Sequence, residues 1–192
     1  MAFEIGFSDF VMNIARDLPV IGFFSVFFAT YFTYLVSAGV LYLILKIKRV
    51  KEKAFTFLFL SLSSVIAAGF FAPIIRAITL RERPLSIFEG NPLVSLTGTS
   101  LPSGHASYLF ALACGLFFFN KKWGKWFLGF AVVNAIGRMF IGAHWPTDII
   151  LGVFVGIASA FLVKYLIWRY KPEYAEEKNQ EHDGAEEDIH LQ

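Results

Sequence analysis

The chain has very little cysteine and only a small excess of charge. Cys114 is the single cysteine among 192 residues, so an internal disulfide is excluded, and its place in an apolar run favours a buried thiol that packs as a small hydrophobic side chain. Lysine and arginine number 17 against 15 aspartates and glutamates, a net charge of +2. No basic stripe of the kind that nucleic-acid binding requires accompanies this charge, so a nucleic-acid partner is not expected.

A secretory signal and internal repeats are also missing. Residues 1–17 mix acidic with apolar side chains and lack the charged start and apolar core of a signal peptide. Apolar residues, by contrast, are abundant: 56% of the chain is hydrophobic, 23 residues are Phe, and the mean hydropathy is +0.59. A soluble domain of this length is usually about 45–50% apolar. The excess predicts an integral membrane protein of one domain.

Uncharged apolar segments divide the chain into candidate membrane spans. Leu18–Leu45 and Ala54–Ile75 contain no charged residue, and each can cross a hydrocarbon core of about 30 Å, which takes roughly 20 helical residues. Three further spans are expected from Ser103 to Phe119, from Trp126 to about Ile141, and from Ile149 through Val163 to about Trp168. The predicted fold class is therefore all-α, a polytopic membrane helix bundle of about five transmembrane helices.

The two ends of the chain differ from this membrane domain, which covers residues 18–170. Residues 1–17 place Phe3, Phe7 and Phe10 at roughly helical spacing among charged residues, which predicts an amphipathic helix lying in the membrane interface. Residues 171–192 are rich in Glu and Asp and have no apolar period, so a disordered, solvated cytoplasmic tail is expected there.

Clusters of lysine set the orientation of the predicted spans. One cluster follows the first span, between Lys46 and Lys53, and another follows the third, between Lys121 and Lys125. By the positive-inside rule both lie in cytoplasmic loops. With five crossings, residues 76–103 and residues 138–148 then face outward on the same side. These two segments hold most of the ionisable residues that adjoin apolar spans.

Three arginines follow the second span on the outward side: Arg76, Arg81 and Arg83. Arg76 and Arg83 are seven residues apart, so a helix that continued to Pro84 would place both on one face. They could be interfacial arginines that snorkel toward headgroups. The positive-inside rule makes a cluster of arginines uncommon on the outward side. A bound phosphate dianion is the alternative explanation for this cluster, because the guanidinium fork matches phosphate oxygens bidentately.

The stretch Pro102-Ser103-Gly104-His105 opens the third span. Ser103 is a good N-cap, and Gly104 allows a ligand to approach the backbone closely. The first N–H groups of the helix have no intrahelical partner and form a ready anion site. His105 in the first turn could donate a proton to a group that leaves this anion, although helix capping alone would also explain the motif.

A histidine and an aspartate flank the start of the fifth span. Pro146 suits the first helical position and Asp148 the first turn. Asp148 lies four residues after His144 and is expected within reach of one imidazole nitrogen. A carboxylate there would fix the tautomer and make the other nitrogen the better nucleophile. A capping aspartate beside an interfacial histidine is the structural alternative.

Taken together, the three motifs resemble those of the type 2 phosphatidic acid phosphatase family of integral membrane lipid phosphatases. The family signatures Lys-x6-Arg-Pro, Pro-Ser-Gly-His and Ser-Arg-x5-His-x3-Asp appear here, in order, as Arg76-x6-Arg83-Pro84, Pro102-Ser103-Gly104-His105 and Gly137-Arg138-x5-His144-x3-Asp148. The resemblance covers roughly residues 54–164. The compact chain is similar to the small bacterial lipid A 1-phosphatases and to the small undecaprenyl diphosphate phosphatases, with a preference for the former.

The resemblance implies a role for each matched residue. His144 attacks phosphorus and forms a phosphohistidine, Asp148 orients it, and His105 protonates the leaving oxygen. The groups implied to bind the phosphoryl oxygens are Arg76, Arg83, Arg138, Ser103 and the Gly104 N–H. Arg76 replaces the usual Lys, which changes reach and geometry, and Gly137 replaces the usual Ser, which removes a hydroxyl donor. Both departures are expected to bear on substrate choice.

The implied reaction needs neither metal nor cofactor, because phosphoryl transfer asks mainly for positioning and charge neutralisation. The implied substrate is a lipid phosphate or diphosphate: lipid A 1-phosphate first, then undecaprenyl diphosphate, then phosphatidylglycerol phosphate or phosphatidate. The expected location is a bacterial cytoplasmic (inner) membrane, with the site on the periplasmic face. A protein that binds or transports a phospholipid headgroup without turnover is the non-enzymatic alternative.

Overall fold

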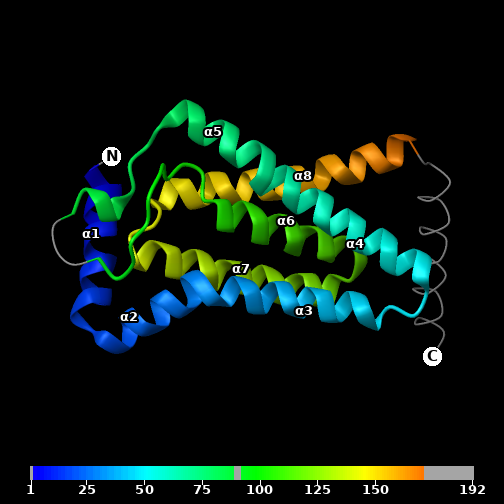
Figure 1. The fold of residues 1–192 in the computed structure, drawn as a ribbon, viewed down its shortest axis with the longest axis horizontal. Coiled ribbons are helices and arrows are strands. Elements are labelled where there is room, and N and C mark those ends of the chain that lie inside the picture. The colour runs from blue at the N-terminus through cyan, green and yellow to red at the C-terminus, as the bar shows by residue number, and fades with distance from the viewer. Residues whose placement is uncertain (1, 89–91, 171–192) are drawn as a thin grey trace.

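The computed structural model of the protein describes residues 2–88 and 92–170, and every regular element in these residues is a helix. The elements in Figure 1 are α1 (Ala2–Asp17), α2 (Pro19–Val26), the π-helical turn η1 (Phe27–Tyr31), α3 (Phe32–Lys46), α4 (Val50–Ser64), the π-helical turn η2 (Val65–Phe71), α5 (Ala72–Thr79), the 3₁₀ helix η3 (Pro84–Ser86), α6 (Gly104–Phe119), α7 (Lys121–Phe140) and α8 (Pro146–Tyr170). The predicted acidic tail, residues 171–192, lies outside the described residues.

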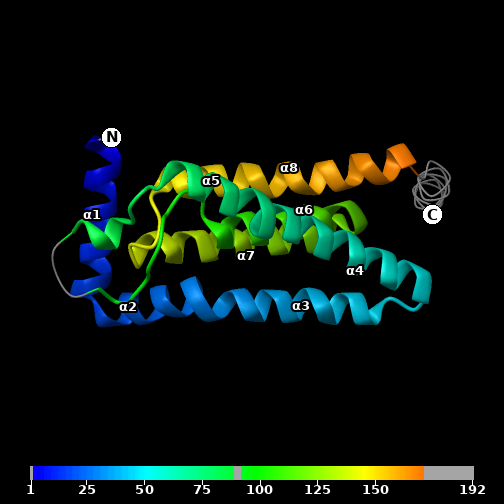
Figure 2. The same ribbon diagram turned by 45° about the horizontal axis from the view of Figure 1, so that its top comes forward.

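Long helices run side by side along the molecule (Figures 1 and 2). α2, η1 and α3 form one rod from Pro19 to Lys46, and α4, η2 and α5 form a second rod that begins at Val50. These two rods and α8 are long and apolar enough to cross a membrane, whereas α6 is an apolar helix of 16 residues. α7 has 20 residues and begins with two lysines. The predicted all-α membrane bundle is confirmed, with α6 and α7 packed alongside the three long spans.

Two glycines on α8 allow it to approach α6 closely. Gly152 and Gly156 are four residues apart, a spacing of small residues that lets membrane helices pack backbone to backbone. A Cβ at Gly152 would stand 2.7 Å from the carbonyl oxygen of Ser103, and one at Gly156 would stand 2.6 Å from that of Ser107. The contact between α6 and α8 is the most extensive in the described bundle. It therefore fixes the start of α6 against the start of α8.

Polar side chains set where α6 and α7 begin. Ser103 accepts a hydrogen bond from the backbone N of Ala106 at 3.4 Å, as predicted for an N-cap. Asn120 accepts one from the backbone N of Trp123 at 3.0 Å and starts α7 directly after α6. Because of this cap, residues 121–125 lie in the first turns of α7. The prediction from the sequence that these residues form a loop is therefore wrong. Pro146 opens α8 as predicted.

One end of the bundle collects the segments that carry the three motifs. α1 crosses this end, transverse to the long helices (Figures 1 and 2). The described parts of the chain from α5 to α6, and the turn from α7 to α8, lie beside it. The predicted N-terminal helix is thus present, while its placement in the membrane interface stays a prediction.

The helix that carries Arg76 ends before it reaches Arg83. Leu80 adopts a left-handed backbone with φ of 47° and ends α5, with its N donating to the carbonyl of Arg76 at 3.2 Å. Arg83 has an extended backbone, with φ of −81° and ψ of 151°. The predicted continuous helix from Arg76 to Arg83 is therefore wrong, and the two side chains reach the same end of the bundle from different backbone conformations.

Replacing Gly156 with valine should destabilise the bundle, because the added carbons would overlap the carbonyl of Ser107 and the backbone N of Ala111. Overpacking typically costs about 1–3 kcal/mol, and here the obstacle is backbone that cannot rotate away. Gly129→Val on α7 is the matched control, since nothing lies within 4 Å of a Cβ there. Thermal unfolding in detergent should give a lower Tm for Gly156→Val than for Gly129→Val; equal values would contradict the close packing of α6 on α8.

Candidate active site

The end of the bundle crossed by α1 holds all the residues that the motifs single out. They come from α5 (Arg76), the segment before η3 (Arg83), the start of α6 with its cap (Ser103, Gly104, His105), α7 (Arg138), and the turn into α8 (His144, Asp148). Backbone hydrogen bonds join these segments: Leu85 N donates to Gly142 O at 2.9 Å, and Ser103 N donates to Asp148 O at 3.0 Å. The structure thus brings the three motifs, far apart in sequence, to one place.

His144 lies in the turn between α7 and α8 and is almost completely buried, with 1% of its surface exposed. Its Nδ1 is 2.8 Å from the carbonyl oxygen of Ser100. Because a carbonyl can only accept, this contact assigns the ring proton of a neutral imidazole to Nδ1. Nε2 then carries the lone pair, and it faces Nη2 of Arg138 at 3.3 Å.

The burial of His144 also sets its charge. Burial lowers the pKa of His144 from 6.5 to about 4, and the nearby Arg138 guanidinium acts in the same direction, while the carboxylate of Asp148 opposes both. At neutral pH the ring is therefore uncharged. An uncharged imidazole with its proton held on Nδ1 presents Nε2 as a nucleophile.

Asp148 does not make the hydrogen bond to His144 that the motif predicts. Its Oδ2 is 3.7 Å from Nδ1 of His144, too far for a hydrogen bond. Oδ2 accepts instead from the backbone N of Trp145 at 2.8 Å, and Oδ1 accepts from Nη1 of Arg81 at 2.7 Å. The carbonyl of Ser100 thus contacts Nδ1 of His144 directly, and Asp148 contacts the backbone of the turn that carries His144. The orienting role of Asp148 stays a prediction.

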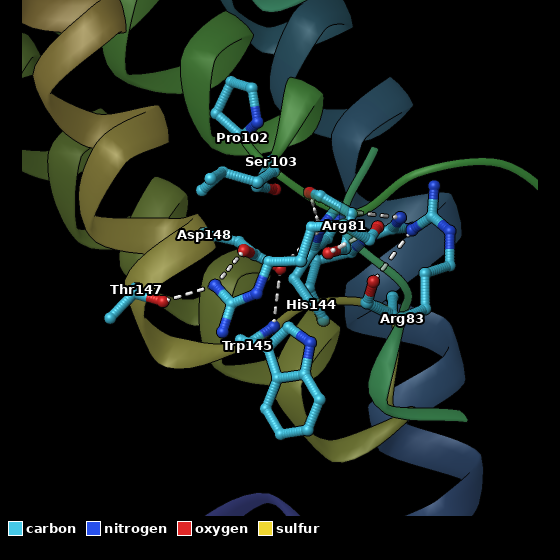
Figure 3. Close-up of polar contacts among 12 residues, drawn as sticks. Arg81, Arg83, Pro102, Ser103, His144, Trp145, Thr147 and Asp148 are labelled. Atoms are coloured by element: carbon cyan, nitrogen blue, oxygen red, sulfur yellow. Dashed lines mark hydrogen bonds and ion pairs between the residues drawn. The ribbon is translucent and has the colours of Figure 1, made fainter. Parts of the chain in front are cut away.

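Arg81, Thr147 and Ser100 join the site although the motif spacing points to none of them. Arg81 donates to the Thr147 hydroxyl at 2.6 Å as well as to Asp148, as Figure 3 shows. Its guanidinium also lies 5.2 Å from the centre of the Trp145 ring. The position of Arg81 between two motif arginines is the one sequence signal that could have singled it out. Ser100 carries no signal, because it contributes a backbone carbonyl.

Arg76 lies against the first turn of α6. Its Nε and Nη2 both donate to the carbonyl of Pro102, at 3.1 and 2.9 Å. A Cβ at position 104 would stand 2.9 Å from Nη2 of Arg76, so glycine at this position makes room for the guanidinium. The backbone of Gly104 and the Arg76 fork therefore lie side by side.

Arg83 and Arg138 are both buried, with 8% and 6% of their surfaces exposed. Arg83 donates to the carbonyl of Ala143 at 2.8 Å and to that of Gly98 at 3.1 Å. Arg138 is less well satisfied: its Nη1 reaches the carbonyl of Ala29 only at 3.5 Å, and its Nε has no hydrogen-bond partner among the described residues. A buried donor without a partner is costly, so Arg138 is suited to take an anionic ligand.

His105 lies half-buried in the first turn of α6. The positive charge of Arg138 and the ring of His144 both act on it electrostatically. The two imidazoles therefore occupy the same end of the bundle, within electrostatic reach of each other.

The site carries a surplus of positive charge. Arg138 is repelled by Arg83 and Arg76, and Arg83 is repelled by Arg76. The carboxylate of Asp148 attracts Arg76 and Arg83, but it is itself bound to Arg81. Like charges gathered in a buried region are unfavourable unless an anion joins them. The geometry therefore suits a phosphate group.

Gly137, the other departure from the family pattern, is explained by helix packing. A Cβ at this position would stand 2.9 Å from the backbone N of Ala29 and 3.1 Å from the carbonyl of Ser25. A serine hydroxyl here would thus press against the backbone of the first rod, where α7 packs on α2 and η1. The missing side chain lets these helices approach, and it brings the carbonyl of Ala29 next to Arg138.

Known proteins resemble this chain over its motif-bearing part. The PAP2 superfamily matches residues 55–172. The lipid A 4'-phosphatase of Bacteroides thetaiotaomicron is 27% identical over 140 residues, which cover 67% of this chain and 61% of that protein. The undecaprenyl-diphosphatase of Sulfolobus acidocaldarius is 37% identical over 81 residues, 41% of this chain and 37% of that protein. The chain thus spans less than two thirds of the length of these curated relatives.

Solved structures match more of the chain. LpxE of Aquifex aeolicus superposes with a TM-score of 0.64 and 25% identity, covering 86% of this chain and 96% of that one. A PAP2-type phosphatidylglycerolphosphate phosphatase of Bacillus subtilis superposes with a TM-score of 0.55 over 88% of this chain and 87% of that one, and its 19% identity shows likeness of fold alone. The segment matched by the family, residues 55–172, is more than half of the chain and contains all three motifs. The chain belongs to the PAP2 superfamily.

Proposed function

We propose that the protein is a membrane lipid phosphatase that removes a phosphate from a lipid headgroup through a phosphohistidine on His144. The observation that carries this proposal is the surplus positive charge of Arg76, Arg83 and Arg138 around a buried, uncharged imidazole. Membership of the PAP2 superfamily supports it, because the curated relatives bear the names of a lipid A 4'-phosphatase and an undecaprenyl-diphosphatase.

The reaction proceeds in two steps. Nε2 of His144 attacks phosphorus, and an N–P bond forms while the bond from phosphorus to the lipid oxygen breaks and His105 gives its proton to that oxygen. The carbonyl of Ser100 holds the ring proton on Nδ1, which keeps Nε2 available. Water then attacks phosphorus, His105 takes a proton from it, and inorganic phosphate leaves as the N–P bond breaks and His144 is restored.

The phosphoryl oxygens lie among the three arginines. Nη2 of Arg138, 3.3 Å from Nε2 of His144, turns to a phosphoryl oxygen when phosphorus occupies the position in front of the ring. Arg76 and Arg83 neutralise the charge that spreads over these oxygens in the transition state. The hydroxyl of Ser103 and the N–H of Gly104, at the start of α6, complete the set.

An apolar cavity of about 500 Å³ provides space for the lipid chain. Side chains of α3, α4, η2 and α6 line it, and Tyr108 on its wall is three residues, about one helical turn, after His105. The Tyr108 hydroxyl lies 2.9 Å from Oγ of Ser37, which ties α6 to α3 beside the cavity. We propose that the apolar chain of the substrate lies in this space, with its phosphate directed past Tyr108 toward the start of α6.

The proposed substrate is a lipid phosphate or diphosphate. A lipid A phosphate is favoured by the match to the Bacteroides lipid A 4'-phosphatase, which extends over 67% of this chain, and removal of the 1-phosphate is the specific reaction predicted from the sequence. Undecaprenyl diphosphate is the second candidate, supported by the Sulfolobus relative, which is more similar over a shorter segment. Phosphatidylglycerol phosphate and phosphatidate follow.

The proposed location is a bacterial cytoplasmic (inner) membrane, with the site on its periplasmic face. α3 ends with Lys46 and α7 begins with Lys121. These two helix ends lie at the end of the bundle opposite α1 (Figure 1). By the positive-inside rule that end is cytoplasmic. The site then faces outward, where the headgroup of a lipid in the outer leaflet would meet it.

A panel of purified lipids in detergent tests the proposed function through phosphate release. The panel consists of lipid A 1-phosphate, lipid A 4'-phosphate, undecaprenyl diphosphate, phosphatidylglycerol phosphate and phosphatidate. Wild-type protein should release phosphate from at least one of them, and His144→Ala should lose essentially all turnover while still binding that lipid, because the arginines remain. Binding without turnover by both proteins would favour a headgroup-binding or transport protein instead.

The charge state of His144 can be measured directly. Because burial lowers its pKa to about 4, the ring should stay neutral as the pH falls through 6.5 and gain its proton only near pH 4. Nitrogen NMR of protein labelled at histidine, with the His144 signal assigned from its absence in His144→Ala, follows this titration. A midpoint at or above 6.5 would contradict a nucleophile held neutral by burial.

Turnover should be insensitive to metal chelation, because three guanidiniums and the start of α6 supply the charge neutralisation. No group of three or more His, Cys, Asp or Glu side chains that could hold a metal ion gathers within residues 2–88 and 92–170. Phosphate release in excess EDTA is expected to stay within about twofold of the untreated rate, a change smaller than the loss of one oxyanion donor would cause. Loss of activity in EDTA that magnesium restores would show that the reaction needs a metal.

A further inference from the structure

Glu4 of α1 contacts the first turn of α8, which follows the turn that carries His144, from the other end of the chain. Its Oε1 accepts hydrogen bonds from the Thr147 hydroxyl at 2.5 Å and from the Thr147 backbone N at 3.1 Å. Its Oε2 accepts from Nη2 of Arg81 at 2.8 Å. Nη1 of the same guanidinium binds Asp148 at 2.7 Å. One carboxylate on α1 thus reaches both the first turn of α8 and the arginine that holds Asp148.

The rest of α1 is packed so that Glu4 stays in this place. Val11, Met12 and Ala15 on its inner face are at most 4% exposed. A Cβ at Gly142, whose φ is 69°, would stand 2.6 Å from Cε of Met12, so the methionine fills the space beside this glycine. α1 is therefore seated on the turn between α7 and α8, next to the residues that Glu4 contacts.

The contacts of Glu4 keep it charged. Burial opposes its ionisation, but the hydrogen bonds from Thr147 and Arg81 prevail and lower the pKa of Glu4 below its ordinary value. Its side chain is only 14% exposed, and that of Arg81 28%, so the ion pair is shielded from solvent more than a surface pair would be. A carboxylate at the first turn of α8 is also favoured by the helix dipole.

Arg81 connects Glu4 to the nucleophile through a short path. In Figure 3 its guanidinium lies between Thr147 and Asp148, with Trp145 below it. Asp148 in turn accepts a hydrogen bond from the backbone N of Trp145, the residue after His144. Without Glu4, Nη2 of Arg81 loses a charged partner, while Nη1 keeps its hydrogen bonds to Thr147 and Asp148. The guanidinium is then held less firmly, and so is the turn that Asp148 contacts.

We propose that Glu4 is a positioning residue for phosphoryl transfer, which acts through Arg81 to hold Asp148 and the His144 turn in the reactive geometry. The inference rests on the proposed function, because it gives α1 a part in the same reaction. The hydrogen bonds of Glu4 go to Thr147 and Arg81 and not to the phosphate-binding groups. Its loss should therefore slow turnover while substrate binding is kept.

Glu4→Gln tests the proposal, since it removes the charge and nearly keeps the shape. Its kcat should fall about 10- to 100-fold, because a displacement of about 1 Å at a reacting group can cost about 10²-fold, while KM changes less than about threefold. Asp9→Asn is the matched control: it removes the same charge from the same helix, and Asp9 makes no hydrogen bond or ion pair with the described residues. Its kcat should equal that of wild type.

Arg81→Lys, alone and combined with Glu4→Gln, shows whether Glu4 acts through Arg81. All variants are compared as the folded, monodisperse fraction from size exclusion, on the lipid that wild type hydrolyses best. Glu4→Gln should cost much less in the Arg81→Lys background than in wild type, because the two residues share one path. An equal cost in both backgrounds, or a kcat for Glu4→Gln equal to that of Asp9→Asn, would overturn the proposal. Wild-type protein inactive on the whole panel would overturn the proposed function itself.

Discussion

The hydrogen bond from the backbone N of Ser103 to the carbonyl of Asp148, 3.0 Å long, joins the start of α6 to the start of α8. The rest of the site depends on it, because His105 follows Ser103 by two residues and His144 precedes Asp148 by four. Gly152 permits this contact, since any side chain there would collide with the carbonyl of Ser103. The relative position of the two helix starts, next to His105 and to the turn with His144, is therefore set by the packing of membrane helices, which is more rigid than a contact between loops.

The features that could be predicted from the sequence depend on local rules. Long uncharged apolar segments predicted the membrane-spanning helices, because a helix must have a minimum apolar length to cross a hydrocarbon core. Ser103 and Pro146 marked the starts of α6 and α8, since each residue suits one position at a helix N-terminus. The number of predicted crossings correctly placed the segment after α5 and the turn before α8 at one end of the bundle, because each crossing reverses the direction of the chain. The side of the membrane that this end faces, inferred from the lysine clusters, stays a prediction.

The features that could not be predicted depend on long-range contacts or on backbone atoms. Leu80 ends α5 in a left-handed conformation, although glycine is the residue usually found in that conformation at the end of a helix. Ser100 orients His144 through its carbonyl, which any residue type could supply. Glu4 meets Thr147 across 143 positions of the sequence, a pairing that only the seating of α1 determines. The π-helical turn η1, which offers the carbonyl of Ala29 to Arg138, likewise has no pattern of residue types that would indicate it.

The partners of the arginines explain why these residues divide into two kinds. Arg76, Arg83 and Arg138 donate to backbone carbonyls, which satisfy some of their N–H groups but leave the positive charge uncancelled. Arg81 is bound by two carboxylates, those of Glu4 and Asp148, so its charge is already neutralised. A carboxylate beside any of the first three would compete with a phosphate for the same guanidinium. At this end of the bundle the carboxylates of Glu4 and Asp148 therefore both bind Arg81, and the charge of the other three arginines remains available to an anion.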